Sequence, residues 1–81
     1  MALNLSRNRI GDDGARALAG GRLGGLRFLS LSSCNLSDAS GLWLATSVLA
    51  GRLEVLDLSD NRFSTGAREE LRERFGERVR L

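Results

Sequence analysis

Short alternations of apolar and polar residues recur three times along the chain. Residues 3–5, 29–31 and 56–58 each read leucine, polar residue, leucine, which is the period of a half-buried β-strand. After the second alternation, apolar residues follow at helical spacing, and these are Leu42, Leu44, Ala45, Val48 and Leu49. This spacing predicts a helix that packs on the strand layer. The pattern therefore favours an α/β protein in which strands and helices alternate.

Aligning the alternations on Leu3, Leu29 and Leu56 brings further positions into register at intervals of 26 and 27 residues. The matched columns are Leu5, Leu31 and Leu58; Ser6, Ser32 and Ser59; Asn8, Cys34 and Asn61; Ile10, Leu36 and Phe63; and Leu18, Leu44 and Leu71. A repeat of this length predicts units that stack on one another, because a single unit cannot bury its own apolar face.

The columns follow the pattern L-x-x-L-x-L-x-x-N/C-x-L over essentially all 81 residues, which resembles the leucine-rich repeat family. The resemblance implies a single solenoid domain over residues 1–81, with repeats at about 1–25, 26–52 and 53–81. Such a solenoid is a horseshoe arc with parallel strands on its concave side and helices on its convex side. Gly14, Leu18 and the alanines around them resemble the helix-bearing, ribonuclease-inhibitor-like subtype of NOD-like receptors. Residues 71–81 resemble the ends of bacterial members, which implies a fragment with a C-terminal cap.

Polar and small residues predict where the helices begin and end. Asp12 and Asp38 fall at expected helix N-termini, where negative charge is favourable. Ser64 or Thr65 would cap the third helix. The glycines expected to end the first helix are Gly20, Gly21, Gly24 and Gly25.

One column predicts polar groups inside the stack. Asn8 and Asn61 are expected to point inward after their strands, where backbone groups lose their ladder partners and an amide can satisfy both donors and acceptors. Cys34 occupies the same column and is expected to be a small buried thiol. A structural role is therefore favoured for this column over a catalytic one.

The helical segments also predict how the convex side packs. Trp43 is expected to fill space between adjacent helices rather than to hold a ligand. Leu71, Phe75 and Val79 recur at four-residue spacing within 67–81, which predicts that this whole segment is the last helix and the terminal cap.

Outward positions of the stacked strands would form columns on the concave face. Solenoid concavities commonly hold partners, and Phe28, Arg7 and Arg62 are plausible anchors there. A merely solvated face is the alternative interpretation. The candidate partner-binding residues are Asn4, Arg7, Arg9, Phe28, Ser30, Ser33, Val55, Asp57, Asp60 and Arg62.

The composition restricts the chemistry. The chain is 42% apolar and 27% charged, which is typical of a globular protein. It has no histidine and a single cysteine, which excludes histidine-dependent catalysis, disulfides and cysteine-rich zinc sites. We expect no enzyme activity, no metal and no cofactor. Arginines interleave with carboxylates and no long apolar run is present, so neither nucleic acid nor a membrane is an expected partner.

Together these observations predict a cytoplasmic module that binds a protein partner through its concave face. The lone cysteine fits a reducing compartment, and no secretory signal is visible. The alternative, implied by the resemblance, is an enzyme regulator such as a GTPase-activating or inhibitor protein of the same repeat family.

The first unit begins within its motif, so residues 1–21 are expected to fray or to pair with a second copy through exposed leucines. Amide hydrogen exchange checks this expectation. We expect faster exchange in the first unit than in the second, and equal protection of both units in a monomer would contradict it.

Overall fold

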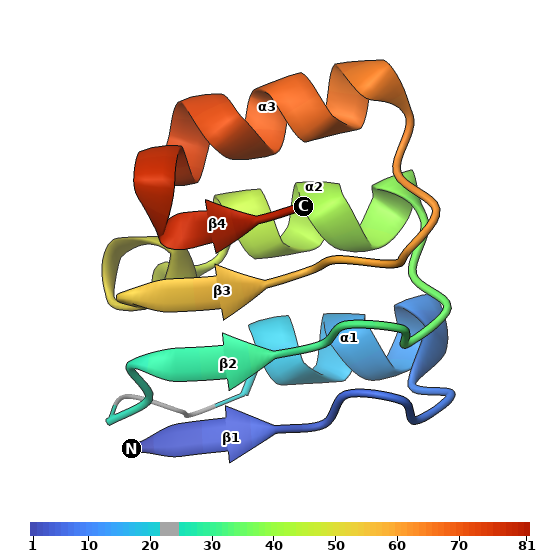
Figure 1. The fold of residues 1–81 in the computed structure, drawn as a ribbon. Helices are drawn as coiled ribbons and strands as arrows, with labels where there is room; N and C mark the ends of the chain where they lie inside the picture. Colours follow the sequence, from blue (N-terminus) through green and yellow to red (C-terminus); the bar gives the residue numbers. More distant parts are fainter. Residues whose placement is uncertain (22–24) are drawn as a thin grey trace.

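The computed structural model describes residues 1–21 and 25–81 and contains one parallel sheet of four strands (Figure 1). The strands lie in chain order, and they are β1 (Ala2–Asn4), β2 (Phe28–Ser30), β3 (Val55–Asp57) and β4 (Val79–Arg80). The predicted solenoid architecture of about three repeats is confirmed. Of the glycines expected to end the first helix, Gly24 lies outside the described residues.

The strands stack in the register that the leucine columns predict. Leu3 pairs with Leu29, and Leu29 pairs with Leu56. Just beyond the strands, the next leucine column stays aligned, since the N–H of Leu5 donates to the carbonyl of Ser30 at 2.9 Å and that of Leu31 donates to Asp57 at 2.8 Å. Each repeat therefore meets its neighbour through backbone hydrogen bonds in one fixed register.

Within residues 1–21 and 25–81, three α-helices return the chain along one side of the sheet, and none of them covers the other side (Figure 1). They are α1 (Gly11–Ala19), α2 (Asp38–Thr46) and α3 (Thr65–Phe75), and two 3-10 turns follow at η1 (Val48–Gly51) and η2 (Gly76–Arg78). Within the described residues, no helix has the length and apolar character needed to cross a bilayer.

The core lies between the sheet and the helices. Among the leucines that the structure describes, nine are each less than 2% exposed: Leu26, Leu29, Leu31, Leu36, Leu44, Leu53, Leu56, Leu58 and Leu71. Each fully buried leucine contributes roughly 1.5–3 kcal/mol relative to an exposed one. Trp43 is half-buried, and the guanidinium of Arg16 lies 5.5 Å from its ring centre, so it links α1 and α2 as expected of a filler.

The predicted inward packing of two helical residues is wrong. Leu42 is 55% exposed and Val48 is 68% exposed. Leu42 lies within α2, which turns Gly41 and Leu44 inward instead. Val48 is exposed because α2 ends at Thr46 and the chain continues as a 3-10 turn, which brings Leu49 rather than Val48 into the core.

The prediction of a helix through residue 79 is also wrong. The helix ends at Phe75, where Gly76 adopts a left-handed φ of 61° that glycine tolerates at little cost. Leu71 and Phe75 are buried as expected, whereas Val79 lies in β4 beside Leu56. The terminal cap is therefore a helix together with an added strand.

Arg78 connects the C-terminal segment to the junction of the second and third repeats. Its guanidinium donates to the carbonyls of Ala50 and Leu53, both at 2.9 Å, and also to carbonyls near the end of α3. A planar guanidinium with several fixed donors suits such a cluster of acceptors. Hydrogen bonds from Arg78 therefore hold the segment after α3 against the preceding chain.

Asn8 and Asn61 occupy equivalent positions in the repeat but make different hydrogen bonds. The Oδ1 of Asn61 accepts the N–H groups of Cys34 and Leu36, each at 3.0 Å. Its Nδ2 donates to the carbonyl of Leu31 at 2.8 Å. All three partners belong to the preceding repeat, so the predicted inward role of Asn61 is confirmed.

Asn8 does not point into the stack, so this prediction is wrong. Its side chain is exposed, and its Nδ2 donates only to the Leu5 and Ser6 carbonyls of its own turn. The physical reason is that the first repeat has no neighbour on this side among the described residues. Cys34 is fully buried as predicted, and its Sγ donates to the carbonyl of Leu5 at 3.1 Å.

We predict that Asn61→Ala lowers the free energy of unfolding by about 2–4 kcal/mol, because two N–H groups of the second repeat lose their acceptor. Urea denaturation followed by circular dichroism measures the loss. Asn8→Ala is the matched control in the same column and should cost less than about 1 kcal/mol. Similar losses for both variants would contradict the assigned role of Asn61.

Candidate functional site

The uncovered side of the sheet, here called the strand face, carries the residues that the sequence predicts as a binding surface. Parallel register places Asn4 beside Ser30 and Ser30 beside Asp57. Arg80 extends this row on β4. Arg80 is exposed, and the sequence pattern did not indicate it because the four-residue spacing of Leu71, Phe75 and Val79 predicts a helix here. The row is therefore continuous across four strands.

A second row on the strand face is apolar. Phe28 pairs with Val55, and both side chains are half-buried. Ala2 occupies the same row on β1 and is exposed. Since neighbouring strands lie only about 4.8 Å apart, Phe28 and Val55 form one small apolar surface that water still reaches.

Local hydrogen bonds hold the polar row in place. The Oδ1 of Asn4 accepts both the N–H and the hydroxyl of Ser6, at 3.0 and 2.7 Å. The Oδ1 of Asp57 does the same with Ser59, at 3.1 and 2.7 Å. These two side chains therefore fix the turns that leave β1 and β3, in the manner of Asx turns.

Ser30 is buried, whereas the sequence predicts it to be exposed on the binding surface. It is only 5% exposed, because its short side chain lies in the central part of the row between the longer Asn4 and Asp57. Little of Ser30 is left for a partner to touch.

The turns after the strands share an unusual backbone conformation. Arg7, Ser33 and Asp60 have φ values of 62°, 54° and 58°, and Asn35 has 60°. The left-handed region is rare for residues with a side chain. All four side chains are exposed, and the first three occupy equivalent positions in successive repeats. The backbone thus presents one exposed side chain at the same place in each turn.

Arginines complete the strand face and its turns. Arg9 and Arg62 are exposed at equivalent positions of the first and third repeats. Together with Arg7 and Arg80 they supply fixed positive charge, while Asp57 and Asp60 supply negative charge. The exposed charges are consequently mixed in sign, and the apolar pair Phe28 and Val55 lies at the starts of β2 and β3.

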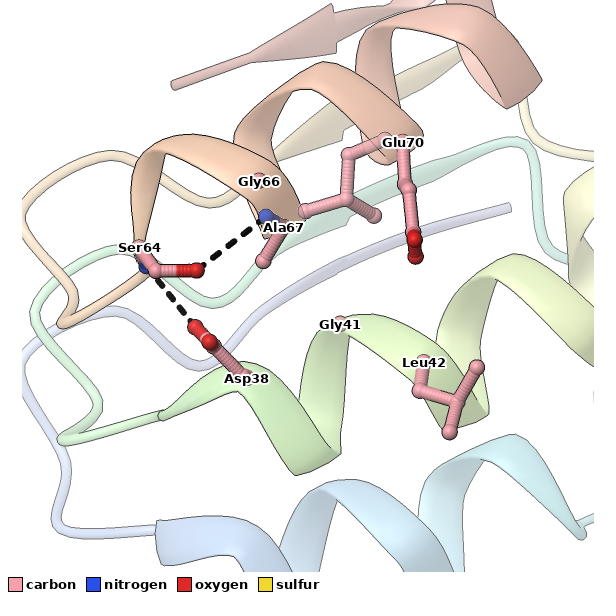
Figure 2. Close-up of a pocket in the computed structure, with 8 residues that line it drawn as sticks. Asp38, Gly41, Leu42, Ser64, Gly66, Ala67 and Glu70 are labelled. Carbon is pink, nitrogen blue, oxygen red and sulfur yellow. Dashed lines mark hydrogen bonds between the residues drawn. The ribbon is translucent and has the colours of Figure 1, made fainter.

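A groove of about 420 Å³ lies on the opposite side, between α2 and α3 (Figure 2). The carboxylate of Asp38 points to the start of α3 and accepts the N–H of Ser64 at 2.8 Å. The Ser64 hydroxyl accepts the N–H of Ala67 at 3.2 Å, which confirms Ser64 as the helix cap. The groups at this end of the groove therefore connect two helices.

Asp12 makes the corresponding connection between the first and second repeats. Its carboxylate accepts the N–H of Ser37 at 2.9 Å, the hydroxyl of Ser37 at 2.6 Å and the hydroxyl of Ser40. Ser40 is fully buried, so its hydroxyl depends on this acceptor. Both aspartates lie in the first turn of their own helices, as predicted, and each also holds the start of the next helix.

These contacts shift the acidity of both aspartates. Burial would raise the pKa of Asp12, but hydrogen bonds from Ser37 and Ser40 outweigh burial and lower that pKa below the usual 3.8. Hydrogen bonding to Ser64 lowers the pKa of Asp38 in the same direction. Both groups are therefore charged throughout the neutral range, where they act as acceptors.

A parallel sheet built from repeated strand–turn–helix units, with one face left open, defines a solenoid of the kind that binds other molecules along its strands. Two family models described as leucine-rich repeat match the chain, one over residues 1–19 and the other over residues 25–46 and 52–73. The chain therefore belongs to the leucine-rich repeat proteins. No curated protein matches it closely.

We predict that Asp12→Ala lowers the free energy of unfolding at neutral pH by about 1–2 kcal/mol, since the buried Ser40 hydroxyl loses its charged acceptor. Because the folded-state pKa is lowered, the contribution of Asp12 is present above pH 3.8 and is lost as pH falls through the folded-state value. As the pH is lowered, the free energy of unfolding should therefore fall less steeply in the variant than in the original chain. Asp13→Ala, a neighbouring exposed carboxylate, is the control and should leave the acid limb unchanged.

Proposed function

We propose that this chain is a non-catalytic module that binds a protein partner through its strand face. The observation that carries the proposal is the apolar pair Phe28 and Val55, which lie side by side in register on a sheet face that no helix covers. Within the fold, apolar side chains of the same strands are buried completely at Leu29 and Leu56. Phe28 and Val55 remain accessible because they alternate to the open side.

The surroundings of this pair fit recognition of a protein. A partly exposed aromatic residue gives a contact that a partner can desolvate, and such contacts carry much of the energy of binding. Arg80 is exposed on β4, and Arg9 and Arg62 are exposed in the segments that follow β1 and β3. A guanidinium can bind a carboxylate with two parallel hydrogen bonds. The expected partner therefore presents an apolar side chain flanked by carboxylates.

The finer classification belongs to the same proposal. Units of 26 and 27 residues that each include an α-helix support the ribonuclease-inhibitor-like subtype, the group that includes NOD-like receptors. The likeness of residues 71–81 to bacterial members supports a bacterial source. The unpaired, buried Cys34 supports a reducing, cytoplasmic setting.

An enzyme whose activity changes on binding is one form that the partner can take. GTP turnover by small GTPases, measured with and without the chain, separates a GTPase-activating role from simple binding. Unchanged GTP turnover would exclude a GTPase-activating role, and the proposal that the chain binds a protein partner would still stand.

We predict that Phe28→Ala weakens binding of a captured partner at least about tenfold, because loss of an aromatic anchor costs more than about 1.4 kcal/mol. Arg62→Ala should weaken it less. Affinity capture with the whole chain, followed by calorimetry on the isolated partner, measures both effects.

The matched control is Leu42→Ala, which removes an exposed apolar side chain from the helix side and should leave affinity unchanged. Circular dichroism verifies that all variants are folded. Full binding by Phe28→Ala together with weakened binding by Leu42→Ala would place the site on the helices and overturn the proposal.

A further inference from the structure

The groove between α2 and α3 lies on the helix side of the molecule, opposite the strand face (Figure 1). Its volume is about 420 Å³. Most of the residues that line it are exposed, and these are Asp38, Leu42, Ser64, Gly66 and Glu70. The groove is therefore shallow and accessible along the two helices.

A carboxylate stands on each wall of this groove. Asp38 belongs to α2, and its Oδ1 accepts the N–H of Ser64 at 2.8 Å. Glu70 belongs to α3, and its side chain extends toward α2 (Figure 2). Within the part of the chain that the structure describes, neither carboxylate forms an ion pair. Arg74, one turn after Glu70, donates from its Nε to the carbonyl of Ala45 at 3.1 Å instead. Both negative charges thus remain available to a ligand.

Most of the remaining lining is small or apolar. Gly41 allows α2 and α3 to pack closely, since a Cβ at this position would approach the side chains of Leu71 and Phe63 to 3.3 Å. Leu42 is 55% exposed beside it, and Ala67 lines the opposite wall. An apolar surface therefore accompanies the two carboxylates.

Gly66 keeps space open at a position where the fold does not require glycine. Its φ lies outside the left-handed region, and a Cβ there would meet only the Oγ of Ser64, at an ordinary contact distance of 3.9 Å. Glycine loses more conformational freedom on folding than any other residue. Because Gly66 lines the groove, its missing side chain leaves room for a ligand rather than for a neighbouring helix.

Two carboxylates beside small and apolar residues match the chemistry of an arginine side chain. A guanidinium is planar, is more weakly hydrated than an ammonium, and carries five N–H donors that can serve acceptors on two sides. Its aliphatic stem can lie against an apolar surface. A phosphate or a carboxylate ligand would be repelled by Asp38 and Glu70.

The open form of the groove favours an arginine that belongs to a protein segment. Sites for small molecules enclose most of the surface of their ligand, whereas both Leu42 and Glu70 are exposed here. A segment of a partner can place an apolar side chain on Leu42 while its arginine reaches the two carboxylates, so that more of the contact is desolvated.

We propose that the groove between α2 and α3 is a second interaction surface, which holds an arginine side chain of a partner protein between Asp38 and Glu70 and a neighbouring apolar residue on Leu42. This surface is separate from the strand face, because the helices and the open side of the sheet lie on opposite sides of the molecule (Figure 1).

A short peptide Gly-Leu-Arg-Leu-Gly with blocked ends tests the proposal, and the same peptide with citrulline in place of arginine is the matched control. Binding to the isotope-labelled 81-residue chain is followed by NMR chemical shifts. We expect shifts centred on residues 38–42 and 64–70. The citrulline peptide should bind at least about fivefold more weakly, because it is neutral and loses the charge-assisted hydrogen bonds.

Substitutions in the chain locate the contact. Glu70→Gln and Asp38→Asn should each weaken the arginine peptide about threefold, and asparagine retains an acceptor for the N–H of Ser64. Glu73→Gln is the matched control, since Glu73 is an exposed carboxylate of the same helix that does not line the groove, and it should leave affinity unchanged. Phe28→Ala should also leave it unchanged, so failure of this proposal is distinguishable from failure of the strand-face proposal.

Four results would each overturn the proposal: equal affinities for the two peptides, shifts confined to the strand face, equal losses from Glu70→Gln and Glu73→Gln, or no shifts at millimolar peptide. Sedimentation of the chain covers the competing occupant. A dimer that Glu70→Gln weakens would assign the groove to a second copy and overturn the proposal as well.

Discussion

Peptide groups beyond the ends of parallel strands need hydrogen-bond partners inside the stack, and this need determines how the repeats of this protein lie on one another. Asn61 supplies an acceptor to two N–H groups of the preceding repeat. Asp12 and Asp38 supply carboxylates to the starts of the following helices. Because a buried donor without an acceptor costs about 1–3 kcal/mol, only one register satisfies all three residues. With the repeats aligned in this way, the inward leucines of neighbouring repeats pack against one another in the core.

The same requirement makes the two ends of the stack unequal. At the C-terminal end, β4 pairs with β3, and Arg78 donates hydrogen bonds to carbonyls at the junction of the second and third repeats. At the N-terminal end, the amide of Asn8 and the leucines around it keep the form of an internal interface while remaining partly open. Among the described residues, the two ends of the stack therefore differ in how many of their polar groups have partners.

The binding surface follows from the core through strand alternation. Once Leu29 and Leu56 point inward, Phe28 and Val55 must point to the open side. Most of the strand face could therefore be predicted from the sequence. Ser30 was predicted to be exposed but is buried between longer neighbours, and Arg80 was missed because four-residue spacing suggested a continuing helix. Both errors concern contacts that neighbouring strands decide.

The sequence by itself determined the repeat length, the inward leucine columns and the alternation of strands with helices, because these depend on periods within a single unit. Only the tertiary structure decided which asparagine bonds to another repeat, since Asn8 and Asn61 share one motif and differ in having a neighbour among the described residues. It also decided that the chain leaves its last helix at Gly76 and adds β4. Such choices depend on contacts between units, and the pattern within one unit does not encode them.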